Sequence, residues 1–126
     1  MHKSRLCNIV VDCHGVSMPD AVRFWGGVLG LEPDPGDQPD DRYFGFTQAT
    51  ASGVRILLQR VEDGGAFHLD LETDDLEAEV RRLEALGATR KRRVSTWYVM
   101  RAPTGHDFCV VERKRGTLGD DATTWP

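Results

Sequence analysis

Residues 67–87 read FHLDLETDDLEAEVRRLEALG and combine two structural periods in one short stretch. Apolar and polar residues alternate over 67–72, which predicts a half-buried β-strand. After Asp74, a suitable N-cap with Glu77 three residues later, apolar residues recur at helical spacing until Gly87. The stripe they form consists of Leu76, Val80, Leu83 and Leu86. The stretch therefore predicts a strand that leads directly into an amphipathic helix.

The same order of signals occurs 57 residues earlier in the chain, where residues 6–13 alternate and a helix is expected from Ser17 to Gly30. Extended segments follow each helix, at 42–47 and 54–61 in the first half and at 89–94, 97–102 and 107–112 in the second. We interpret 5–61 and 66–112 as an internal repeat within a single domain, 1–126. The polar tail, 113–126, is expected to be loose or to lie over a neighbouring element.

Composition excludes several classes of function. The chain has 126 residues with 16 Lys+Arg against 20 Asp+Glu, a net charge of −4 that offers nucleic acid little to bind. The basic run 90–93 is interpreted as a solvated edge strand. No apolar run approaches the roughly 18 residues of a membrane span, and the N-terminus is too short and polar for a signal peptide. We therefore expect a cytoplasmic protein with three free cysteines.

Alternation along the two predicted first strands indicates where a ligand would bind. Leu69 and Leu71 must cover the second helix, so His68, Asp70 and Glu72 share the opposite face. In the first half, Ile9, Val11 and Cys13 cover the helix and leave Asn8, Val10, Asp12 and His14 opposite. A curved sheet with polar side chains on its concave face is typical of a ligand cleft.

Several of these side chains have two interpretations. His68 either contacts a ligand or bonds a neighbour, such as Asp70 or a residue on the adjacent strand. Asp70 and Glu72 can serve as an acid–base pair, or one of them pairs with Arg55 or Arg101. Aromatic residues either pack in the core or line the cleft, and of the adjacent Phe24 and Trp25 one can enter the core while the other points sideways. The strand aromatics in question are Phe44, Phe46 and Trp97.

Three segments resemble the glyoxalase/bleomycin-resistance/dioxygenase superfamily, also called vicinal oxygen chelate proteins. They are FWGGVLGL at 24–31, HLDLETDDLE at 68–77 and APTGHDFCVVE at 102–112. The resemblance, which is nearest to the glyoxalase-like subgroup, implies an α+β fold. In that fold two βαβββ modules form an open, curved eight-stranded mixed sheet. It also implies that the protein is a homodimer.

In metal-dependent members of the superfamily, four positions can ligate a divalent ion. Carried over, these positions fall on His68, Cys109, Asn8 and a site near Leu57, where Gln59 is the nearest polar residue of the same face. Catalytic zinc usually has three protein ligands. We therefore expect no complete metal site and no implied cofactor, and if a divalent metal does bind, His68 and Cys109 are its ligands.

The leading hypothesis is a glyoxalase-like protein that binds a small, partly hydrophobic organic molecule in the concave cleft. Any catalysis would depend on His68 and Asp70, and the predicted ligand contacts are Asn8, Phe44, Phe46, Gln59, Glu72, Trp97 and Cys109. One alternative is a divalent-metal-dependent lyase, isomerase or dioxygenase of the same superfamily. A second is a non-catalytic dimeric interaction module. Fold does not choose among these functions, nor does it identify the ligand.

Overall fold

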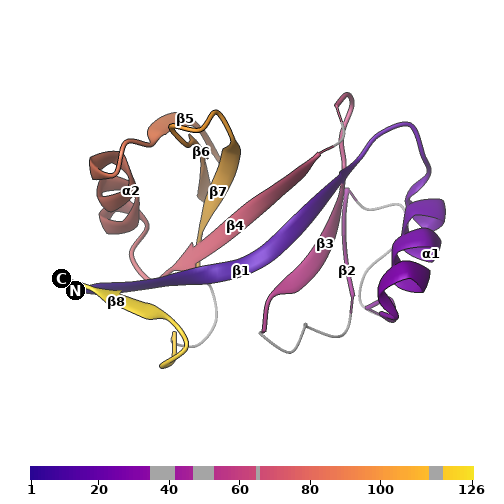
Figure 1. The fold of residues 1–126 in the computed structure, drawn as a ribbon, viewed down its shortest axis with the longest axis horizontal. Coiled ribbons are helices and arrows are strands. Elements are labelled where there is room, and N and C mark those ends of the chain that lie inside the picture. Colours follow the sequence, from indigo (N-terminus) through magenta and orange to yellow (C-terminus); the bar gives the residue numbers. More distant parts are fainter. Residues whose placement is uncertain (35–41, 47–52, 65, 114–117) are drawn as a thin grey trace. The chain divides into compact units, whose positions relative to one another are not determined.

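The computed structural model describes residues 1–34, 42–46, 53–64, 66–113 and 118–126. Its strands and helices follow in the order β1 (His2–Cys13), α1 (Met18–Leu29), β2 (Tyr43–Gly45), β3 (Arg55–Arg60), β4 (Phe67–Thr73), α2 (Leu76–Ala85), β5 (Thr89–Val94), β6 (Trp97–Arg101), β7 (Asp107–Glu112) and β8 (Thr123–Trp125). The strands form an eight-stranded sheet in the order β2-β3-β1-β4-β7-β6-β5, with β8 paired to β1 (Figure 1). The sheet is mixed, because β1 and β3 are parallel whereas β6 and β7 are antiparallel. The expected α+β class with an eight-stranded mixed sheet is confirmed.

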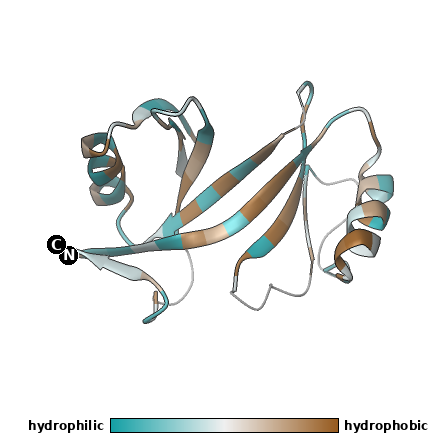
Figure 2. Cartoon of the chain, viewed as in Figure 1, coloured by the Kyte–Doolittle hydropathy of each residue, from teal (hydrophilic) through white to brown (hydrophobic). Residues whose placement is uncertain are grey.

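The chain divides into two compact units. The α1 unit comprises residues 8–68, and the α2 unit comprises residues 1–7 together with 69–126. The long strands β1 and β4 each contribute residues to both units. Teal and brown bands alternate along β4, as expected for a strand with one polar and one apolar face (Figure 2).

In the α1 unit, helix α1 covers the face of β1 that carries Val11 and Cys13. The hydroxyl of Ser17 caps the helix by accepting a hydrogen bond from the Asp20 amide at 3.2 Å. Gly30 ends it in the left-handed region, at φ 68°, where a residue without Cβ has no steric penalty. Both predicted helix ends are confirmed. The core beneath the helix consists of Val11, Cys13, Met18, Ala21, Phe44, Phe46 and Leu58.

One expectation for this part of the chain needs correction. The apolar stripe of α1 is buried only in part, since Val28 and Leu29 near its C-terminal end are exposed. Among the described residues, the first half contributes β1, β2, β3 and an isolated bridge between Pro33 and Phe46. The eighth strand is β8, which comes from the tail.

In the α2 unit, helix α2 packs over β7 and β6, and its core consists of Leu76, Val80, Leu83, Ala88, Met100 and Val110. The N-cap is Asp75, one residue beyond the predicted Asp74. The Asp75 carboxylate accepts from the Ala78 amide at 3.0 Å, whereas the Asp74 carboxylate accepts from the Lys3 amide at 2.7 Å. Both aspartates can cap a helix, but the Asp74 carboxylate is already bonded to β1, so Asp75 takes the N-cap position.

The chain ends meet within the α2 unit. His2 of β1 pairs with Trp125 of β8, and the Trp125 indole donates to the Ser4 hydroxyl at 2.9 Å. The Arg82 guanidinium lies 3.7 Å from the centre of the Trp125 ring. Leu118 and Ala122 are buried. The described part of the tail, residues 118–126, therefore packs against the protein and is not loose.

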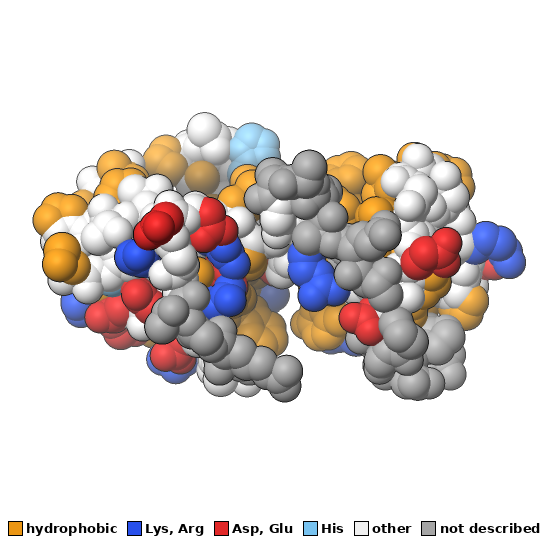
Figure 3. All heavy atoms as spheres, turned by 90° about the horizontal axis from the view of Figure 1, so that it is seen from below, with side chains coloured by type: hydrophobic (Ala, Val, Ile, Leu, Met, Phe, Trp, Pro, Cys, Tyr) orange, Lys and Arg blue, Asp and Glu red, His pale blue; other side chains and the backbone are white. Residues whose placement is uncertain are grey.

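The basic run 90–93 falls on β5, the edge strand predicted for it. Arg90 pairs with Glu77 and Glu84, and Lys91 pairs with Asp107. On the face drawn in Figure 3, Lys and Arg side chains lie beside Asp and Glu side chains. These ion pairs neutralise much of the run's charge. Neither α1 nor α2 has the length and apolar character needed to span a bilayer.

Candidate functional site

The residues that the sequence singled out divide between the two units. The α1 unit holds Asn8, Phe44, Phe46, Gln59 and His68, and the α2 unit holds Asp70, Glu72, Trp97 and Cys109. Within the α1 unit, Asn8 and Gln59 lie on the neighbouring strands β1 and β3, where Gln59 is in register with Asp12.

His68 bonds Asp12 on the adjacent strand. Its Nδ1 lies 2.9 Å from Asp12 Oδ2, and both side chains are about five-sixths buried, at 17% exposed each. The Asp12 backbone amide donates to the Ala66 carbonyl at 2.8 Å, which fixes the strand ends around this pair. The interpretation of His68 as a strand histidine bonded to a cross-strand neighbour is confirmed, with Asp12 as the partner.

Phe44 and Phe46 occupy the core, not a binding surface. They are 3% and 0% exposed, their rings are 6.1 Å apart, and they pack with the residues beneath α1. Their predicted role as ligand contacts is therefore wrong. The short strand β2 directs Phe44 towards the helix-covered side, and Phe46 follows it by alternation.

In the α2 unit, Asp70 of β4 is in register with Cys109 of β7. Glu72 accepts hydrogen bonds from Arg5 and Arg113, each at 2.6 Å. The predicted partners, Arg55 and Arg101, pair instead with Asp34 and Asp107. Trp97 is half-buried at the start of β6, in register with Val111 of β7.

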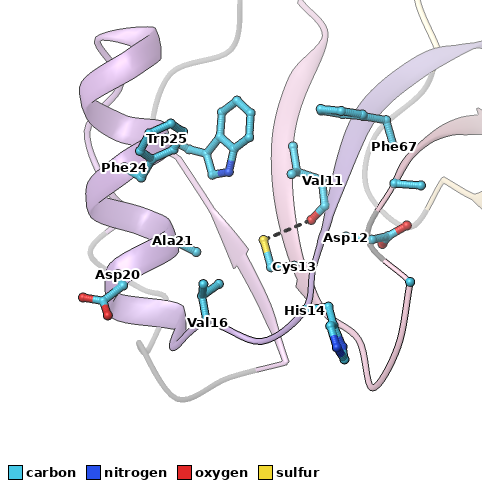
Figure 4. A pocket seen from close by; sticks show the side chains of 12 residues that line it. Val11, Asp12, Cys13, His14, Val16, Asp20, Ala21, Phe24, Trp25 and Phe67 are labelled. Atoms are coloured by element: carbon cyan, nitrogen blue, oxygen red, sulfur yellow. Dashed lines mark hydrogen bonds between the residues drawn. The ribbon is translucent and has the colours of Figure 1, made fainter.

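A cavity of about 590 Å³ lies in the α1 unit, between α1 and the end of β1 (Figure 4). Aromatic rings from α1 and β4 form much of its wall. The Phe24 and Trp25 ring centres are 5.3 Å apart, and those of Trp25 and Phe67 are 6.1 Å apart, with both pairs edge to face. The full lining consists of Val11, Asp12, Cys13, His14, Val16, Asp20, Ala21, Phe24, Trp25, Gly64, Ala66 and Phe67.

The polar residues that line this cavity are few, namely Asp12, Cys13, His14 and Asp20. Burial, followed by the nearby Asp12 carboxylate, raises the pKa of the Cys13 thiol, so it is a weakly reactive wall group. Apolar walls with a small number of placed polar groups are typical of small-molecule sites, and the volume lies within their range of about 300–1,000 Å³.

The sequence only partly indicated this cavity. Trp25 packs against the core while Phe24 is 61% exposed, as their adjacency in a helix predicted. Asp12 was placed on the polar face of β1, but nothing in the pattern singled it out as a site residue. Phe67 opens β4 with its side chain largely exposed, and a strand-initial aromatic residue carries no distinctive signal.

The four superfamily metal positions do not fit a complete metal site in this chain. One of them falls near Leu57, an aliphatic side chain on β3 with no donor atom, where Gln59 is the nearest polar residue of the same face, and another falls on the neutral amide of Asn8. The third, His68, already has its Nδ1 against Asp12. Catalytic zinc usually has three ligands drawn from imidazole, thiolate and carboxylate groups, and of this set only His68 and Cys109 are of these kinds.

A glyoxalase-like domain model matches residues 8–111, most of the chain, and the protein therefore belongs to the glyoxalase-like domain family. Solved structures with the same fold include a hypothetical protein from Bacillus halodurans, with a TM-score of 0.67 and 15% identity over 92% of this chain and 99% of that one.

Two further structures are similar. One is a methylmalonyl-CoA epimerase from Mycobacterium tuberculosis, with a TM-score of 0.59 and 18% identity over 87% and 88% of the two chains. The other is a glyoxalase/bleomycin resistance protein/dioxygenase superfamily member from Vibrio splendidus, with a TM-score of 0.54 and 18% identity over 86% and 100%. No curated protein is significantly similar in sequence. At these identities the likeness concerns the fold alone.

Proposed function

We propose that this protein binds a small, partly hydrophobic organic molecule in the cavity of the α1 unit. The observation that carries the proposal is the aromatic wall formed by Phe24, Trp25 and Phe67 around a space of about 590 Å³. Flat apolar groups bury large area against such rings and gain further from edge-to-face contacts.

Replacement of Phe67 by alanine tests the proposal. The Phe67 side chain is 62% exposed, so its removal opens the cavity wall with little effect on the core. We expect the affinity for a bound aromatic ligand to fall about fivefold, since one ring contact contributes on the order of 1 kcal/mol. Binding is measured by the quenching of tryptophan fluorescence across a panel of aromatic amines, alcohols and acids.

Leu86→Ala is the matched control, because Leu86 is 68% exposed and is not among the residues that line the cavity. Its affinity should equal that of the unmodified protein. Absence of quenching across the whole panel, or equal effects of the two variants, would contradict the proposal.

A second function is favoured by donors of the α2 unit, where Asp70 of β4 is in register with Cys109 of β7. Carboxylate and thiolate are both zinc ligands, which keeps a metal-dependent lyase, isomerase or dioxygenase as the rival function. Elemental analysis of protein purified without chelator separates the two, because about one metal ion per chain would favour the rival.

The third alternative, a dimeric interaction module, is supported by the exposed apolar side chains of α1. Val28 is 58% exposed and Leu29 is 43% exposed at the C-terminal end of the helix. A homodimer remains a prediction, which sedimentation equilibrium tests directly.

A further inference from the structure

We infer that the molecule bound in the α1-unit cavity is uncharged, and that the cavity excludes organic anions and cations alike. The inference rests on the proposed function, because it names the class of aromatic molecule that the same cavity would take. Three observations on the described lining residues support it: they include no basic side chain, their carboxylates are turned away from the cavity, and the groups that face the cavity are neutral.

Basic side chains are few in the α1 unit, and none is among the described residues that line the cavity. The sequence 8–68 contains four arginines and no lysine, and the twelve described lining residues include none of these arginines. Two of the four have partners elsewhere, since Arg23 pairs with Asp20 and Arg55 pairs with Asp34. A carboxylate or phosphate ester that entered the cavity would therefore lose hydration without gaining a cationic partner.

The carboxylates among the described lining residues do not point into the cavity. Asp12 and Cys13 are neighbours on β1, so their side chains lie on opposite faces, and Cys13 packs in the core beneath α1. The Asp12 carboxylate is turned to the other face, where its Oδ2 lies 2.9 Å from His68 Nδ1 (Figure 4). Asp20 points outward from α1, is 59% exposed and pairs with Arg23. An ammonium group in the cavity would thus meet neither of these two carboxylates.

The side chains that face the cavity are neutral. Figure 4 shows Ala21 and Trp25 on the side of α1 that faces β1, with the Cys13 thiol opposite them. Burial, followed by the nearby Asp12 carboxylate, raises the pKa of that thiol, so it stays protonated at neutral pH. His14 is exposed beyond the end of β1. An uncharged aromatic molecule has little hydration to lose against such walls, whereas an unpaired ion loses far more.

A ligand series with one aromatic body tests the inference on the unmodified protein. The probes are 2-naphthalenemethanol, 2-naphthylmethylamine and 2-naphthoate, titrated at neutral pH and constant ionic strength and followed by saturation-transfer NMR. We expect the alcohol to bind at least tenfold more tightly than either ion. Equal affinities, or tighter binding of the amine or the acid, would overturn the inference and leave the proposed function intact. Absence of binding by all three would overturn both.

A cation placed in the cavity wall tests the reason for this preference. Val16 lines the cavity and is 54% exposed, so Val16→Lys should keep the fold and raise the affinity for 2-naphthoate at least fivefold, with little change for the alcohol. Val28→Lys is the matched control, because Val28 is 58% exposed on α1 and is not a lining residue. It should bind all three probes as the unmodified protein does.

Equal affinity of the two lysine variants for 2-naphthoate would overturn the inference, because the missing cation would then not be what excludes the acid. Circular dichroism shows whether each variant is folded. If Val16→Lys does not fold, the probe series on the unmodified protein decides the inference.

Discussion

At the residue scale, Glu79 is a buried carboxylate held by charged and polar partners. Its side chain is fully buried, at 0% exposed, and its carboxylate accepts from Arg82 at 2.9 and 2.7 Å and bonds His2 Nε2 at 2.7 Å. Burial raises the pKa of the Glu79 carboxyl, but the hydrogen bonds from Arg82, His2 and Ser4 outweigh it and leave that pKa below its ordinary value. Glu79 is therefore a charged group that stabilises the fold.

We expect Glu79→Gln to lower the free energy of unfolding by about 3 kcal/mol at neutral pH, because a buried ion pair loses one partner. A depressed pKa contributes stability above the ordinary glutamate pKa of about 4.3 and loses it as pH falls through the lower pKa of the folded protein. The stability difference between the two proteins should thus shrink on acidification below about pH 4. Urea unfolding over pH 3–7 measures it, with the exposed Glu62→Gln as control. A difference independent of pH would contradict the role of the charge.

The sequence could predict some of these residues and not others. His68 was placed on the polar face of β4 because strand alternation is local, and its bond to Asp12 is of the kind expected for such a face. The local sequence pattern did not indicate that Glu79 is buried and paired, because its burial depends on His2, which lies 77 residues away. Phe44 and Phe46 were open to two interpretations, since alternation assigns residues to a face but does not say what covers it.

At the scale of elements, helix α1 begins at a cap that the sequence predicted and that a mutation can test. The Ser17 hydroxyl satisfies the Asp20 amide, one of the unpaired donors of the first turn. Ser17→Ala should lower the free energy of unfolding by about 1 kcal/mol, and Ser17→Asp should preserve it because a carboxylate also caps and complements the helix dipole. Urea denaturation followed by far-UV circular dichroism provides the measurement. Equal stability of all three proteins would contradict a capping role.

The elements that the sequence predicted best are those with a long periodic pattern. Both helices follow from more than ten residues of helical spacing, ended by Gly30 and Gly87, and the strands before them follow from alternation over 6–13 and 67–72. Strand β8 could not be predicted in this way, because Thr123–Trp125 has three residues and no measurable alternation. Strand β8 is extended because it pairs with the start of β1.

At the scale of the whole molecule, the two ends of the chain are joined in one sheet. His2, Lys3 and Ser4 pair with Trp125, Thr124 and Thr123, across the longest sequence separation in the protein. Bringing distant segments together costs loop-closure entropy, so side-chain contacts must stabilise the pairing. Here the Trp125 indole both donates to Ser4 and lies under the Arg82 guanidinium that binds Glu79.

Trp125→Ala should therefore weaken the closure of the chain ends and lower the free energy of unfolding by about 2 kcal/mol, the sum of a cation–π contact and a hydrogen bond. Trp125→Phe keeps a ring beneath Arg82 but lacks the indole donor, so its loss should be about half as large. Hydrogen exchange of the Ser4 amide, followed by NMR, should accelerate in the same order, because Ser4 is paired with Thr123 of β8, whereas the Lys3 amide donates to Asp74. If Trp125→Ala is as stable as the unmodified protein and its exchange is unchanged, the tail does not contribute to the fold, and the eighth strand is an accessory of the sheet.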